Sequence, residues 1–147
     1  MTKNLKQVLV EKVNKSTWWH VTPQDRHSYK KRGKFLASTY RQAEFYGRPN
    51  DIPEQVSISN PIYGFPEADI LKQLFPNEYK DLILDEGEYH PDWYERRISL
   101  DAKMYQKAKK LGYDAIVLLG STGESCLRKN IKPHSMELNL VAFQKCI

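Results

Sequence analysis

Apolar residues follow a strand-like pattern in five segments of the chain. These segments are rich in β-branched and aromatic residues, or alternate between apolar and polar positions, as half-buried strands do. The segments are residues 16–22 (STWWHVT), 34–38 (KFLAS), 54–59 (EQVSIS), 113–120 (YDAIVLLG) and 136–143 (MELNLVAF). Residues 6–13 (KQVLVEKV) alternate only weakly, so they predict either a strand or a short helix.

Helical spacing predicts elements elsewhere. Residues 39–47 (TYRQAEFYG) have capping-box spacing between Thr39 and Gln42, and Gly47 suits a helix end. Residues 66–84 predict one helix followed by a second short helix or turn. The clearest helix spans residues 99–112, with Ser99 as its cap and Gly112 as its stop. Its apolar face comprises Leu100, Met104, Ala108 and Leu111.

The remaining stretches are polar or rich in proline and glycine, which predicts loops. They are residues 24–33, 60–66, 85–95 and 121–135. Strands and helices follow one another without regular βαβ alternation, so the order of elements predicts an α+β fold.

Composition narrows the class of protein. The chain has 147 residues, of which 40% are apolar and 28% charged, as expected for one globular domain over residues 1–147. The longest apolar run, residues 115–119, is too short to span a bilayer, and no signal peptide is recognisable. Cys126 and Cys146 lack metal-ligand spacing. We therefore expect a cytoplasmic, reduced, monomeric protein without metal or membrane partner.

The net charge of +5 raises the question of an anionic partner. Lysines and arginines are spread along the chain rather than concentrated in one run. A solvated basic surface accounts for this pattern, and so does a site for an anionic small molecule such as a dinucleotide.

Two polar residues lie in segments that are otherwise apolar and strand-like. His20 follows two tryptophans, and Glu137 begins the last strand directly after a 15-residue polar loop. A carboxylate at the mouth of a strand beside a long loop is a candidate active-site group.

The ordered motifs HVT, GKFLASTYRQAEFYG, VSISNPIYG, LGYDAIVLLG and MELNLVAF resemble the ADP-ribosyltransferase superfamily, in its histidine–tyrosine–glutamate branch. The resemblance covers residues 16 to 144 and is closest to small stand-alone members from phages and bacteria. It implies two packed, mainly antiparallel sheets with flanking helices and an NAD cleft between the sheets.

The resemblance also implies roles for individual residues in binding NAD. His20 would bond the adenosine ribose, the backbone of Val21 would bond the nicotinamide carboxamide, and Thr22 would orient His20. Phe35 stands where the family has a tyrosine that stacks on nicotinamide. Further residues implied at the NAD site are Ser38 near the ribose and Phe45 or Tyr46 on the other face of the nicotinamide.

Glu137 matches the family's catalytic glutamate, which stabilises the positive charge that develops on the ribose as the glycosidic bond breaks. With His20, it completes the implied catalytic pair. The loop before it would face the acceptor and supplies Glu124, Arg128 and Ser135. Arginine-modifying toxins carry Gln or Glu at the position of Ser135, so this departure speaks against arginine as the acceptor.

The resemblance therefore implies a cytoplasmic mono-ADP-ribosyltransferase that uses NAD and modifies a macromolecule, a protein rather than a nucleic acid. A toxin, effector or anti-CRISPR-like protein of phage or bacterial origin fits this activity. Three alternatives stay open: an RNA 2′-phosphotransferase, an NAD glycohydrolase, and a non-catalytic protein that blocks a nucleic-acid-binding partner.

Strand alternation adds an expectation about the two tryptophans, since adjacent residues on a strand face opposite ways. Trp18 and His20 should share a face and line the NAD cleft. Trp19 should point away and anchor the strand in the core.

Overall fold

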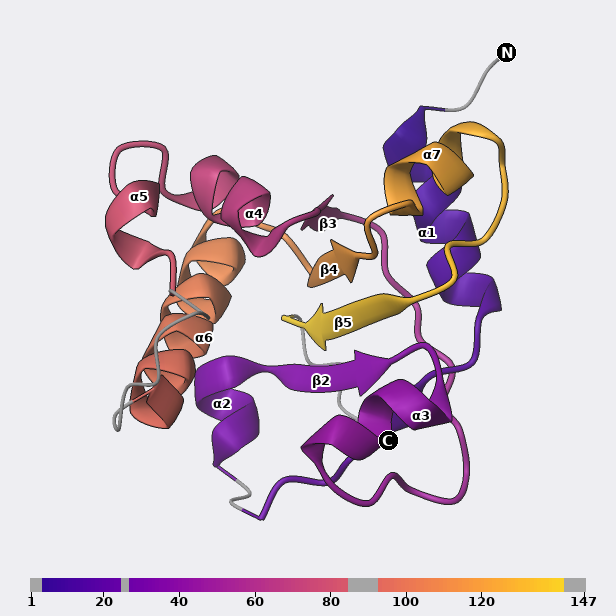
Figure 1. The fold of residues 1–147 in the computed structure, drawn as a ribbon, viewed down its shortest axis with the longest axis horizontal. Coiled ribbons are helices and arrows are strands. Elements are labelled where there is room, and N and C mark those ends of the chain that lie inside the picture. Colours follow the sequence, from indigo (N-terminus) through magenta and orange to yellow (C-terminus); the bar gives the residue numbers. More distant parts are fainter. Residues whose placement is uncertain (1–3, 25–26, 85–92, 142–147) are drawn as a thin grey trace.

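The computed structural model describes residues 4–24, 27–84 and 93–141, which form one five-stranded sheet with helices on both faces (Figure 1). The strand order is β1-β2-β5-β4-β3; β3 and β4 run parallel, and the other neighbours are antiparallel. The strands are β1 (Trp19–His20), β2 (Lys34–Ala37), β3 (Pro61–Gly64), β4 (Ala115–Leu119) and β5 (Met136–Leu140).

Helices α1 and α7 cover one face of the sheet, and α4 and α6 cover the other. Each face has its own apolar core, because strand residues alternate between the two sides. The helices are α1 (Leu5–Lys15), α2 (Ser28–Arg32), α3 (Tyr40–Ala43), the 3₁₀ helix η1 (Glu44–Tyr46), α4 (Glu67–Leu74), α5 (Tyr79–Leu82), α6 (Trp93–Lys110) and α7 (Gly123–Arg128). None of the helices in the described ranges is long and apolar enough to cross a membrane.

Local sequence signals explain several helix ends. Asn4 and Gln7 form a reciprocal capping box at the start of α1, which settles residues 6–13 as helix rather than strand. The Thr39 side chain accepts a hydrogen bond from the Gln42 backbone at the start of α3, as its spacing predicts. Gly47 ends η1 with a φ of 144°, a conformation that favours glycine.

The α+β class is confirmed, but the described strands form one sheet rather than the two packed sheets we expected. The reason is β5, which pairs with β2 on one side and β4 on the other and so joins all strands. Residues 54–59 do not form a strand; Glu54 only makes an isolated bridge to Trp18. Residues 61–64 form β3 instead of the predicted loop, and Pro61 is tolerated there because β3 is an edge strand.

Further predictions of loops and helix ends were also wrong. The predicted loops at 24–33 and 121–135 contain α2 and α7. Helix α6 already includes Trp93, so Ser99 lies inside it and does not cap it. Leu111 is half exposed beyond its end. Most of the predicted loop at 85–95 falls on residues 85–92, which lie outside the described residues, as do residues 142–143 of the last predicted strand.

Candidate functional site

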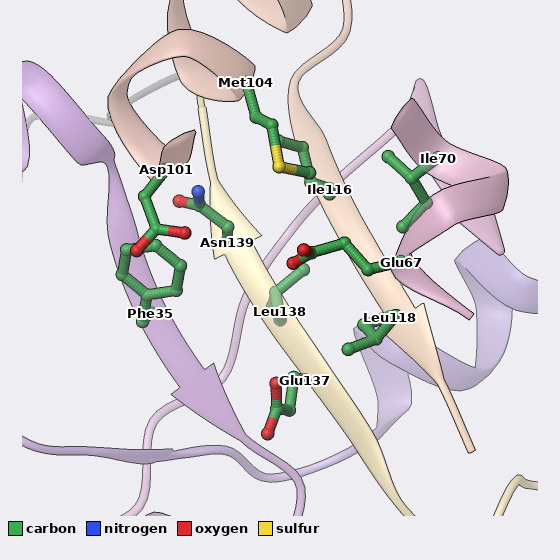
Figure 2. Close-up of a pocket in the computed structure, with 10 residues that line it drawn as sticks. All are labelled: Phe35, Glu67, Ile70, Asp101, Met104, Ile116, Leu118, Glu137, Leu138 and Asn139. Atoms are coloured by element: carbon green, nitrogen blue, oxygen red, sulfur yellow. The ribbon is translucent and has the colours of Figure 1, made fainter. Parts of the chain in front are cut away.

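Glu137 lies on β5 between its two neighbouring strands, opposite Ala37 of β2 and Leu118 of β4. Because opposite residues share a face and every second residue returns to it, Phe35 and Asn139 lie on the same face as Glu137. These side chains line a small hollow together with Glu67 of α4 and Asp101 of α6 (Figure 2). The hollow measures about 60 Å³. It therefore accommodates one small group rather than a whole dinucleotide.

The Tyr46 hydroxyl donates a hydrogen bond of 2.9 Å to Glu137 Oε1. Partial burial and the neighbouring Glu137 carboxylate raise the pKa of Tyr46 above its ordinary value of 10.0, so this hydroxyl stays protonated and remains a donor. No cation pairs with Glu137 in the part of the chain that the structure describes. Glu137 is therefore an oriented carboxylate whose charge is not neutralised by a neighbouring side chain.

The other two carboxylates at the hollow belong to an ion-pair network. Arg97 donates to both Glu67 oxygens, at 2.9 and 2.8 Å, and to Asp101 Oδ1 at 3.0 and 2.7 Å. Arg32 donates to Asp101 Oδ2 at 2.7 Å. Burial lowers the pKa of Arg97, but its bonds to Glu67 and Asp101 outweigh burial and raise it overall. These ion pairs join α2, α4 and α6 beside the hollow, and they leave Glu137 as the one carboxylate lining it that has no ion-pair partner in the described ranges.

Aromatic side chains are exposed around Glu137. Phe35 is 41% exposed, and its ring lies 5.5 Å from the Arg32 guanidinium carbon. Phe45 and Tyr46 are 86% and 67% exposed, although only Phe35 lines the hollow. Of the aromatic residues implied to stack on nicotinamide, Phe35 lines the hollow together with Glu137.

His20 does not lie with Glu137. It pairs with Leu36, which pairs with Leu138, so His20 shares the opposite sheet face with these two core residues. Its side chain is buried, and both ring nitrogens are engaged: Nδ1 with the Phe35 carbonyl at 2.9 Å and Nε2 with the Tyr29 hydroxyl at 2.8 Å. The carbonyl can only accept, so Nδ1 carries the proton and Nε2 accepts from Tyr29. Burial lowers the pKa of His20, although the bond to Phe35 opposes this shift.

The burial of the two tryptophans is the reverse of what we expected. Trp18 is fully buried in the core under α1 and donates its indole N–H to the Val13 carbonyl at 3.0 Å. Trp19 is only partly buried and contacts Tyr40 edge to face, with ring centroids 5.1 Å apart. Trp18 precedes β1, and its backbone pairs with Glu54 instead of β2. Trp18 therefore anchors this segment in the core and does not line a cleft.

The remaining NAD-site residues implied by the resemblance make structural contacts. Thr22 Oγ1 donates to Asn50 Oδ1 at 3.2 Å and does not bond His20. Val21 packs near Gly47. Ser38 is buried and accepts from the Met136 backbone at 2.9 Å, which ties β2 to β5.

The implied substrate-loop residues lie around α7. Glu124 and Arg128 pair with each other at 2.7 Å on the exposed side of α7, the helix that packs against α1. The Ser135 carbonyl accepts from Gly120. The structure brings neither Glu124 nor Arg128 to the hollow, because α7 covers the other face of the sheet.

Sequence reasoning missed the residues that shape the hollow, namely Glu67, Arg97, Asp101 and Asn139. The spacing of Arg97 and Asp101, four positions apart, is a recognisable helical ion-pair signal. It was hidden because the helix was expected to begin at Ser99. Asn139 is a buried polar residue within an apolar strand, and its amide donates to the Arg32 carbonyl at 2.9 Å.

Within the described ranges, no three His, Cys, Asp or Glu side chains are grouped so that they could hold a metal ion. Comparisons of the chain with protein-family models, with curated proteins and with solved structures give no match.

Proposed function

We propose that Glu137 is the catalytic carboxylate of an enzyme that cleaves the nicotinamide–ribose bond of NAD and transfers ADP-ribose to a macromolecular acceptor. One observation carries this proposal: Glu137 is an unneutralised carboxylate, oriented by Tyr46, on the same sheet face as the exposed Phe35 ring. The order of sequence motifs supplies NAD as the donor.

The chemistry that this arrangement suits is glycosyl transfer. The bond between the ribose C1″ and the nicotinamide nitrogen breaks, and its electron pair leaves with neutral nicotinamide. An acceptor hydroxyl or nitrogen forms the new bond to C1″ and releases its proton to Glu137 or to water. Positive charge develops on the ribose during this step, and the Glu137 carboxylate stabilises it. The Phe35 ring provides a flat apolar surface for the nicotinamide.

The proposal does not use His20 as an NAD ligand, since its two ring nitrogens already bond within the protein. His20 instead joins β1, β2 and α2 through the Phe35 carbonyl and the Tyr29 hydroxyl. In this proposal the hollow beside Glu137 takes a single small group at the reacting end of NAD, and the rest of the dinucleotide lies outside the hollow.

The test measures nicotinamide released from labelled NAD by the purified protein, with a bacterial lysate as the source of acceptors. The Glu137→Gln variant keeps the shape but loses the charge, and we expect its rate to fall about 10²–10³-fold. Glu124→Gln is the matched control, because Glu124 is an exposed glutamate that pairs with Arg128 on α7 and does not line the hollow. Wild-type activity in Glu137→Gln, or no nicotinamide release by the wild type, would refute the proposal.

The same reaction separates transfer from hydrolysis. Label on a macromolecule, identified by mass spectrometry, indicates transfer. Nicotinamide release with free ADP-ribose as the sole labelled product would identify an NAD glycohydrolase with the same carboxylate and would refute the transfer step.

A further inference from the structure

The segment that carries Tyr46 also exposes an unusual group of side chains, which we name the aromatic–arginine surface: Arg41, Phe45, Tyr46 and Arg48 on α3, η1 and the turn after them. Phe45 and the adjacent Tyr46 are 86% and 67% exposed, and neighbouring exposed apolar side chains, rather than single ones, mark a binding surface. Arg41 precedes Phe45 by four positions along a helical stretch, which places the two side chains on the same side.

The charges of this surface favour an anionic partner. Arg41 and Arg48 are exposed, and neither forms an ion pair within the described ranges. Other arginines around the hollow are committed, since Arg32 and Arg97 bond Asp101. Glu44 is the one acidic residue between Arg41 and Arg48. Two free guanidinium groups therefore flank two exposed aromatic rings.

Exposed aromatic rings between arginines match the chemistry of a nucleic-acid single strand. Unpaired bases stack on aromatic side chains, and arginines bond the phosphates that link the bases. A duplex offers its phosphates but keeps its base faces stacked inside. A nucleotide strand offers a flat ring and a phosphate in every unit, whereas an acidic peptide offers carboxylates without a ring in every unit.

We propose that the aromatic–arginine surface binds single-stranded nucleic acid and that the bound strand is the acceptor of ADP-ribose. The second half rests on the proposed function. Tyr46 links the binding surface to the catalytic carboxylate, because its ring belongs to this surface and its hydroxyl bonds Glu137 at 2.9 Å. A strand bound along this surface therefore contacts Tyr46, whose hydroxyl bonds the Glu137 carboxylate. A hydroxyl or base nitrogen of the strand bonds C1″ as nicotinamide leaves with the electron pair, and the displaced proton goes to Glu137 or water.

The binding half is tested without NAD, by fluorescence anisotropy of labelled 15-nucleotide dT and U strands over a series of salt concentrations. We expect Phe45→Ala to weaken binding about 5- to 150-fold, the range for loss of one stacked base. We expect the Arg41→Ala/Arg48→Ala double variant to weaken binding at least about 10-fold. Its salt slope should fall by about 1.4, because two phosphate contacts are lost.

The matched control is the Lys109→Ala/Lys110→Ala double variant, which removes the same charge from the exposed end of α6. It should bind within about 3-fold of the wild type. Far-UV circular dichroism confirms that each variant is folded. Equal binding by the wild type and by the Phe45 and arginine variants would overturn the proposal, as would equal competition by a duplex or by poly-glutamate of the same length.

The acceptor half is tested by adding labelled NAD to the bound strand. Label on the strand, lost in Phe45→Ala and in Glu137→Gln, supports it. Nicotinamide release with label on proteins but not on the strand would overturn the acceptor assignment and leave the proposed function standing. Strand binding at this surface without any nicotinamide release would refute the proposed function and leave the binding half standing.

Discussion

Replacing Trp18 by alanine should destabilise the fold far more than the same change at its neighbour Trp19. Trp18 is fully buried, and truncating a buried tryptophan costs about 3–5 kcal/mol. That range includes the cavity left between α1 and the sheet. Trp19 is partly exposed, and its ring contacts Tyr40 edge to face. Such a pair contributes about 0.5–1.5 kcal/mol beyond burial, so we expect a cost of about 1–2 kcal/mol.

The free energy of unfolding is measured by urea titration and followed by far-UV circular dichroism, because tryptophan fluorescence would change with the substitution itself. Trp18→Phe is the milder companion variant. It keeps an aromatic ring but removes the indole N–H that bonds the Val13 carbonyl, which should cost about 1 kcal/mol. The smaller side chain adds a further cost, because it leaves a small cavity. A loss in Trp19→Ala as large as that in Trp18→Ala would refute the assignment of Trp18 as the anchor.

Three further outcomes test the surroundings of the site. Gly33→Ala should cost at least about 2 kcal/mol of stability, because φ is 81° and an added Cβ would lie 2.1 Å from Asn139 Oδ1. Gly112→Ala should cost about 1 kcal/mol, because φ is 88° there but no atom lies within 4 Å of an added Cβ. Thermal melts compare the two variants, and equal costs would contradict the role of the close contact. Burial lowers the pKa of His20 below its ordinary 6.5, so the unfolded chain takes up this proton first as the pH falls. The wild type should therefore lose stability from about pH 6.5 downward, over a range where His20→Gln does not, and parallel pH profiles of unfolding would contradict this. Asp101→Ala should cost about 3–5 kcal/mol in urea titration because it leaves two arginines without their shared partner, and a cost under 1 kcal/mol would show that water replaces the carboxylate.

Local patterns predict much of this fold because they are properties of neighbouring residues. Thr39 caps the start of α3 and Gly47 ends η1, so local spacing alone defines both ends of this short helical segment. The apolar strands at 34–38, 113–120 and 136–143 are found at β2, β4 and β5. Each of them has a strand on both sides, and at least one face of each is buried, which gives apolar runs that are readable in the sequence.

Features that depend on distant partners could not be predicted in this way. Pro61 signals a loop by itself, and only its place at the edge of the sheet makes it compatible with a strand. Alternation places Trp18 and His20 on one face and Trp19 on the other, but it does not tell which face is buried, because packing against the distant helix α1 decides that. Glu137 was singled out from its position before an apolar run, whereas its contact with Tyr46 joins residues 91 positions apart.

The pairing of Trp18 with Glu54 also covers one edge of the sheet. Both backbone hydrogen bonds of that bridge are 2.7 Å long, and the Asn50 backbone donates to the His20 carbonyl at 2.8 Å. The outer rim of β1 is therefore already occupied by the chain's own backbone. At the opposite rim, Pro61 lacks the N–H that an incoming strand would need. Sheet-to-sheet aggregation is discouraged at both rims, and recognition of a partner falls to side chains on the faces and loops.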